Sequence, residues 1–80
     1  MQNKIRFTAN VIPDQHFFLD IVATELRAAG FDVEEVPAAH GLVVQREAET
    51  LEDFLQTIEA QFAAWEEVGG FLIDDYGETA

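Results

Sequence analysis

The fold is decided by residues 50–77, which read TLEDFLQTIEAQFAAWEEVGGFLIDDYG. Large apolar residues recur there at steps of three and four, as on one side of an α-helix. These residues are Leu51, Phe54, Leu55, Ile58, Phe62, Trp65 and Val68. Thr50 is placed to cap the first turn, with Asp53 in the capping-box position, and Gly69-Gly70 can end the helix. We therefore predict a helix over residues 50–68 whose apolar side is covered by the rest of the chain.

The opposite side of this helix is acidic. It carries Glu52, Gln56, Glu59 and Glu66, with no Lys or Arg between them. A spacing of seven residues corresponds to about 10 Å along a helix. We predict that Glu52, Glu59 and Glu66 form a surface that a protein partner contacts.

Composition limits the class of protein. Eighty residues with 49% hydrophobic content predict one small domain over residues 1–80 with a real core. The chain has no cysteine, so the core must stabilise the domain without disulfides or thiolate metal sites. No signal-peptide pattern and no apolar run of membrane-spanning length is visible. The expectation is a cytoplasmic protein.

The charge is strongly negative. Sixteen acidic residues against four basic ones give a formal charge of −12, which repels nucleic acid and anionic lipid. We therefore predict no direct binding to nucleic acid or membrane. Two interpretations of the acidity stay open: it keeps a small domain soluble, or it steers the domain toward a basic protein such as a nucleic-acid enzyme.

The rest of the chain alternates between strand and helix patterns. Period-two patterns predict strands, and apolar residues at helical spacing predict a first helix, which Asp14 can cap and Gly30 can end. The predicted strands cover residues 4–12, 31–34, 42–47 and 71–76, and the first helix covers residues 15–29. Right-handed crossovers in a βαββαβ chain give an α+β, ferredoxin-like sandwich, with four antiparallel strands in the order 4-1-3-2 and two helices on one face.

The first helix supplies part of the predicted core. Its apolar positions keep helical spacing, and they are Phe17, Phe18, Ile21, Val22, Leu26 and Ala29. In the first strand, Ile5, Phe7, Ala9 and Val11 are predicted to face the helices.

The other sheet face is then predicted to be open and mixed in charge. Alternation places Lys4, Arg6 and Thr8 there, together with Asp32, Glu34 and Asp74. Residues 42–44 are apolar at successive positions, so the sequence leaves open on which face Arg46 lies. The open face is interpreted either as cross-strand pairing of opposite charges or as a binding surface.

Groups able to carry catalysis are few. His16 and His40 have neither a second His nor a Cys at ligand spacing, so we predict no metal site and no cofactor. Asp74 and Asp75 are neighbours on a strand, which directs their side chains to opposite faces and prevents a shared proton unless the strand bulges. We predict that the protein is not an enzyme.

The C-terminal motif Asp74-Asp75-Tyr76-Gly77 is a candidate anchor. A Tyr beside Gly at a strand end presents a ring next to exposed backbone, as in many protein contacts, and Asp74 can pair with a cation of a partner. The alternative is that Tyr76 only packs over the end of the sheet.

Two passages support a family resemblance. LRAAGFDVE at residues 26–34 looks like the passage from helix to G-F-E-V in the bacterial regulator of ribonuclease E activity B family. IDDYG at residues 73–77 is similar to that family's closing Tyr-Asp-Gly-Trp-Gly, with Asp74 and Gly77 identical. The resemblance implies a ferredoxin-like protein that binds ribonuclease E and restrains RNA decay without catalysis of its own.

Three classes of function remain. The first is an acidic regulator, an inhibitor of an RNA-processing enzyme such as ribonuclease E. The second is a nucleic-acid mimic, such as a phage-encoded inhibitor of the anti-CRISPR type, whose binding weakens steeply with salt. The third is a self-associating structural module, a homodimer for example, because a sheet with one uncovered face can pair with a copy of itself.

Overall fold

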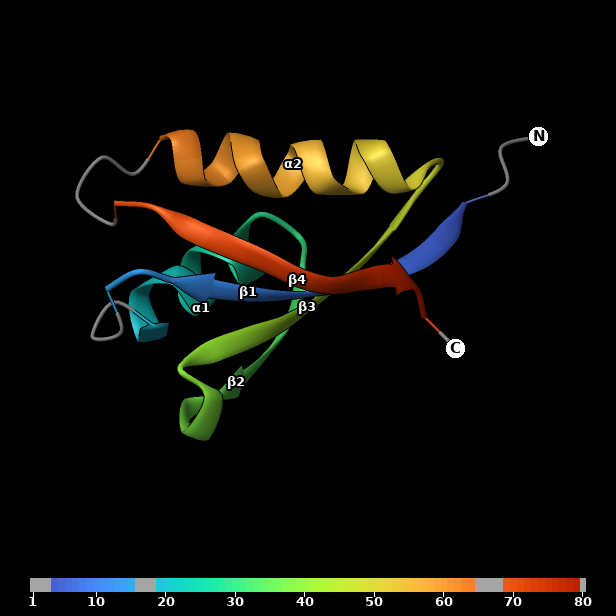
Figure 1. The fold of residues 1–80 in the computed structure, drawn as a ribbon. Coiled ribbons are helices and arrows are strands. Elements are labelled where there is room, and N and C mark those ends of the chain that lie inside the picture. The colour runs from blue at the N-terminus through green and yellow to red at the C-terminus, as the bar shows by residue number, and fades with distance from the viewer. Residues whose placement is uncertain (1–3, 16–18, 65–68, 80) are drawn as a thin grey trace.

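The computed structural model describes residues 4–15, 19–64 and 69–79. The elements follow the predicted βαββαβ order (Figure 1). They are β1 (Ile5–Pro13), α1 (Leu19–Ala28), β2 (Asp32–Val36), the short 3₁₀ helix η2 (Pro37–Ala39), β3 (Gly41–Ala48), α2 (Leu51–Ala63) and β4 (Phe71–Glu78). The sheet has the order β2-β3-β1-β4 with antiparallel neighbours, so the predicted ferredoxin-like α+β fold is confirmed.

One core joins both helices to one face of the sheet. Its buried members are Phe7, Ala9, Val11, Val22, Ala23, Leu26, Phe31, Leu42, Val44, Phe54, Ile58 and Phe62. Phe7, Ala9 and Val11 of β1 belong to this core, as predicted, whereas Ile5 at the start of the strand is 39% exposed and lies outside it. Phe54 lies at its centre, with its ring 5.7 Å from that of Phe7 and 6.4 Å from that of Phe31.

The predicted caps are present at two helix ends. The backbone N–H of Asp53 donates to Thr50 Oγ1 at 3.1 Å, which satisfies one free donor of the first turn of α2. At the end of α1, Gly30 has φ +101°, and the N–H of Phe31 donates to the carbonyl of Leu26 at 3.0 Å. This Schellman arrangement needs a left-handed residue, which explains the glycine.

Helix α2 is shorter than predicted, since it ends at Ala63 and not at residue 68. The described part of α1 starts at Leu19, because residues 16–18 lie outside the described residues. The predicted core residues Phe17, Phe18, Trp65 and Val68 lie outside the described residues, as do His16 and Glu66.

The placement of Ile21 in the core was wrong. Its side chain is 55% exposed, whereas Val22, Ala23 and Leu26 are buried. At 3.6 residues per turn, these three define the inner side of α1, and Ile21 lies almost opposite to it.

Candidate protein-binding surfaces

The sheet face turned away from the helices is called the open face here. Strand register places its side chains in rows that cross the sheet. In one row Glu34 faces Val43, Val43 faces Asn10, and Asn10 faces Asp74. The two carboxylates therefore stand on the two edge strands, β2 and β4, with an apolar residue and an amide between them.

The neighbouring row is apolar. Ile12 of β1 faces Leu72 of β4, and Val36 of β2 faces Gly41 of β3. A Cβ atom at Gly41 would lie 3.1 Å from Ile12 Cγ1, so the absence of a side chain lets these strands carry their apolar groups close together. Leu72 is 56% exposed, which is unusual for a large aliphatic side chain in a sheet.

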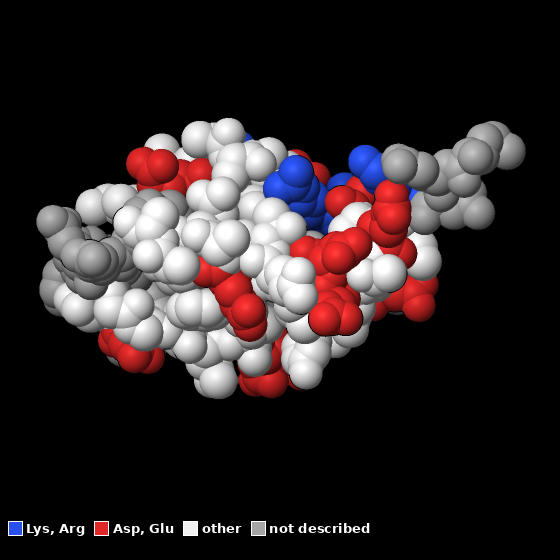
Figure 2. Space-filling view, turned by 90° about the horizontal axis from the view of Figure 1, so that it is seen from above, with Lys and Arg blue, Asp and Glu red and all other residues white. Residues whose placement is uncertain are grey.

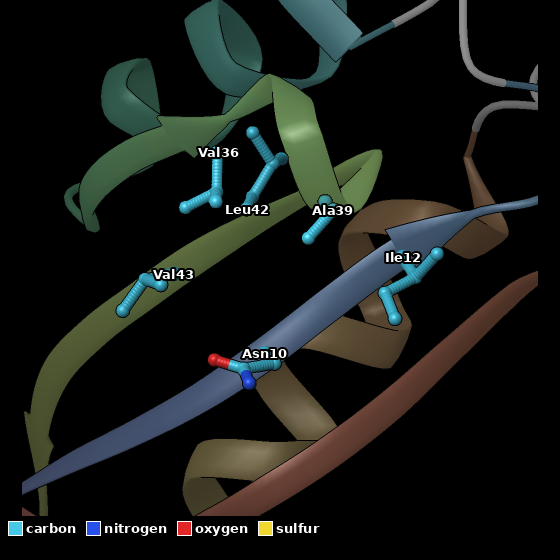
Figure 3. Close-up of a pocket in the computed structure, with 7 residues that line it drawn as sticks. Asn10, Ile12, Val36, Ala39, Leu42 and Val43 are labelled. Carbon is cyan, nitrogen blue, oxygen red and sulfur yellow. The ribbon is translucent and has the colours of Figure 1, made fainter.

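A small pocket opens beside Gly41 (Figure 3). Its volume is about 110 Å³, and it is lined by Asn10, Ile12, Val36, Ala39, Gly41, Leu42 and Val43. This is somewhat less than a cavity of about 150 Å³ that accepts a benzene molecule. The lining is largely apolar, so the pocket suits one aliphatic side chain better than a charged group.

On its other side, the row of Glu34 and Asp74 adjoins a polar and internally paired part of the open face. Arg6 forms an ion pair with Asp32, and its Nε donates to Gln45 Oε1 at 3.0 Å. The hydroxyls of Thr8 and Thr79 share a hydrogen bond. The predicted open-face positions of Arg6, Thr8, Asp32, Glu34 and Asp74 agree with this register.

Arg46 lies on the helix side. It faces Phe7 of β1, a core residue, and its guanidinium carbon is 5.0 Å from the centre of the Phe31 ring. The face that the sequence left undecided for Arg46 is therefore the helix face.

A bulge interrupts β4 at the C-terminal motif. Thr8 faces Gly77 and Asn10 faces Asp74, so Asp75 and Tyr76 together stand opposite Ala9. Asp75 has φ 47°, a left-handed conformation typical of such bulges.

The bulge overturns the prediction that the side chains of Asp74 and Asp75 point to opposite faces. Asn10 Nδ2 donates to Asp75 Oδ2 at 3.4 Å, which brings that carboxylate to the same side of the sheet as Asp74. The N–H of Asp75 also donates to Asp74 Oδ1 at 2.9 Å. The edge of the open face therefore carries two neighbouring carboxylates.

Tyr76 is half exposed and the neighbouring Gly77 has open space on its Cβ side. Alternation from Gly77, which faces Thr8, places Tyr76 toward the helix side of the sheet. The ring thus remains accessible, as an anchor requires, but it does not belong to the same face as Asp74.

The predicted acidic surface of α2 is a separate region. Glu52 and Glu59 are exposed, and Gln56 between them donates to Glu52 Oε1 at 3.3 Å. Figure 2 shows the face over α2: carboxylates crowd near the end where the helix begins, and much of the remaining face is uncharged. Because α2 covers the sheet face opposite to Asp74, the predicted site residues divide into two groups rather than one site.

The arginines are engaged inside the molecule. Arg27 Nη2 donates to the carbonyl of Val33 at 3.0 Å and lies 3.9 Å from Glu35 Oε2, and Arg46 Nη1 donates to the carbonyl of Ala29 at 3.3 Å. Over the described residues the ion pairs are Arg6–Asp32 and Arg27–Glu35. Most of the described carboxylates therefore form no ion pair with a basic side chain of this chain.

Glu35 has an unusual environment. Its pKa is raised above the ordinary value of 4.5, chiefly because the carboxyl shares a hydrogen bond with Asp20. Desolvation and the charge of Asp20 raise it further, while Arg27 opposes the shift. The three groups join β2 to both ends of α1 and lie away from the open face.

Within residues 4–15, 19–64 and 69–79, no group of three or more His, Cys, Asp or Glu side chains could hold a metal ion. Among the helices of these residues, none has the length and apolar character needed to cross a membrane.

The apolar row of the open face was missed in the sequence. The sequence could have predicted it, because Ile12 is an even number of residues from Arg6 in its strand, and Leu72 is an even number from Asp74, so alternation places them on the same face.

Comparison with protein-family models, curated proteins and solved structures finds no match for this chain.

Proposed function

We propose that this domain is a non-catalytic regulator that binds a basic protein. One observation carries the proposal: the arginines are held by groups of the same chain, while carboxylates remain exposed on α2 and on the open face. Such a surface attracts cations from outside the molecule, and a charge of −12 accelerates encounter with a basic partner.

Ribonuclease E is the first partner to test. This partner is proposed because residues 26–34 and 73–77 resemble the regulator of ribonuclease E activity B family. The ferredoxin-like fold is compatible with it but is shared by many functions, so the fold supports the proposal only weakly. The bound domain is expected to slow RNA cleavage by covering an arginine-rich segment of the enzyme.

The test measures association and dissociation of the domain with purified ribonuclease E at several salt concentrations, together with the rate of RNA cleavage. Glu59→Lys is expected to slow association several-fold, and Tyr76→Ala to speed dissociation. Glu25→Lys on α1 is the matched control, because it makes the same change of charge at another exposed helical position. Equal slowing by both Lys variants would indicate that net charge, and not the α2 surface, steers the encounter.

Other outcomes separate the remaining classes. Absence of binding at low salt rejects ribonuclease E as the partner. Binding that is lost steeply with salt and competes with nucleic acid indicates a mimic. A molecular mass that rises with concentration, without any partner, indicates a self-associating module.

A further inference from the structure

We propose that the open face is the docking site for an amphipathic, basic α-helix of the partner, with the helix lying between Glu34 and Asp74. This inference rests on the proposed function and deepens it, since it names the surface and the chemistry of what is bound. The helix places aliphatic side chains on the apolar row and directs Lys or Arg toward the two edge strands.

The apolar part of the surface is the first support. Ile12, Val36 and Val43 are half buried, Leu72 is 56% exposed, and the pocket of about 110 Å³ opens among the first three. An antiparallel sheet can have one face in water, but that face is then expected to be polar. An aliphatic side chain seated beside Gly41 removes apolar surface from water on both partners.

The positions of the carboxylates are the second support. Glu34 and Asp74 stand in one row that crosses all four strands. Their strands, β2 and β4, are three strand spacings apart, a distance of about 14 Å. A helix with its side chains is about 10–12 Å wide, so it fits between these two residues with cations along both of its flanks. Asp75 adds a second carboxylate on the β4 side through its contact with Asn10.

The charge of the surface selects a basic occupant. Arg6, an arginine of the open face, is held by Asp32 and Gln45, which lie in the row next to that of Glu34 and Val43. Glu34 and Asp74 thus have no arginine of their own chain with which to pair. A second copy of the chain would bring the same carboxylates and another −12 of charge to the contact, so the surface favours a basic helix over self-pairing.

The edge of β4 is less suited to binding than the face. The bulge at Asp75 breaks the regular pairing of the strand, a device that hinders addition of a further strand. A helix on the open face needs no free backbone groups and leaves the bulge intact. With the partner helix bound, the sheet has helices on both of its faces, which is a common layered arrangement.

The experiment uses the full chain, labelled with ¹⁵N, and synthetic helical peptides of about 18 residues, long enough for five turns. The first peptide has leucine on one side and lysine on the other. In a second, serine replaces every leucine, and in a third, glutamate replaces every lysine. Amide chemical shifts map the contact, and titration gives the dissociation constant.

The expected result is binding of the leucine–lysine peptide with shifts at Gly41, Val43, Leu72 and Asp74. Leu72→Ser should weaken binding by about fivefold or more, because it removes an aliphatic contact. Ile21→Ser is the matched control, since Ile21 is 55% exposed but lies on α1, and it should leave binding unchanged. Circular dichroism during heating checks that both variants are folded.

Several results overturn the inference. If the serine–lysine peptide binds as tightly, or if shifts centre on Glu52 and Glu59, the acidic domain still binds a basic partner but not through the open face. If the leucine–glutamate peptide binds equally well, the carboxylates do not select the occupant. Shifts of the same residues on concentrating the domain alone indicate a second copy. If no lysine peptide binds, the inference fails, while the proposed function is decided separately by binding to ribonuclease E.

Discussion

Arg46 joins strand β3 to the end of helix α1 through Phe31. Its guanidinium lies over the Phe31 ring, 5.0 Å from the centroid, and Nη1 donates to the carbonyl of Ala29 at 3.3 Å. The last carbonyls of a helix lack partners within the helix and carry the negative end of its dipole. Arg46 therefore acts as a cap supplied by a distant strand, and it also shields an aromatic core residue.

Replacing Arg46 by Met is expected to lower the free energy of unfolding by about 1–2 kcal/mol. The variant loses the cation–π contact and the hydrogen bond to Ala29 but keeps an aliphatic stem. Urea denaturation measures the change. Arg46→Lys keeps the charge without the planar donor group, and an intermediate loss is expected. A Met variant as stable as the parent would show that the contact contributes nothing to folding.

Phe54 is expected to be the most sensitive core position. It is fully buried between Phe7 and Phe31, and Phe54→Ala should cost about 3–5 kcal/mol, a large part of the stability of so small a domain. Phe54→Leu, which leaves a smaller cavity, should remain folded and lose less. Ile21→Ala on the exposed side of α1 is the control, with a change below about 0.5 kcal/mol. Thermal unfolding of the three variants gives the order of their stabilities.

The bulge at Asp75 gives a prediction of opposite sign. Asp75→Gly should stabilise the domain by up to about 1 kcal/mol, because glycine adopts a positive φ without steric cost. The hydrogen bond from Asn10 is long, at 3.4 Å, so its loss offsets little of this gain. Asp75→Ala keeps the strain and should destabilise. Urea denaturation measures the free energy of unfolding of both variants. A Gly variant that is less stable than the parent would contradict this account of the bulge.

The fold could be predicted because local chemistry and global arrangement agree. Thr50 caps α2, Gly30 ends α1, and the alternation in β1 separates a core face from an open face. These signals depend on residues a few positions apart in sequence. They also determine which strands are adjacent, since short connections and right-handed crossovers leave few topologies.

The features that could not be predicted depend on contacts between distant segments. The bulge arises where β4 pairs with β1, and nothing in Asp74-Asp75-Tyr76 alone reveals the shift of register between Thr8 and Asn10. The face of Arg46 is determined by pairing with Phe7. The division of the predicted site residues between α2 and β4 likewise follows from the layers of the fold, which spacing along the chain does not contain.

The stability of the domain is expected to depend on pH through Glu35. Its carboxyl is hydrogen-bonded to Asp20 and lies 3.9 Å from Arg27, and this hydrogen bond, followed by desolvation and the charge of Asp20, raises its pKa above 4.5 in the folded state. In the unfolded chain the group returns to about 4.5. The folded state therefore binds the proton more tightly than the unfolded state does.

The sign of the effect follows from this difference in pKa. Below pH 4.5 the protonated carboxyl contributes its full stabilisation, and this contribution is lost as the pH rises through the raised pKa of the folded state. Thermal unfolding of the parent and of Glu35→Gln across this interval isolates the group, because other carboxylates titrate in both proteins. Relative to the variant, the parent should lose stability as the pH rises. A difference that is constant with pH, or that grows in favour of the parent, would show that the pKa of Glu35 is not raised in the folded protein.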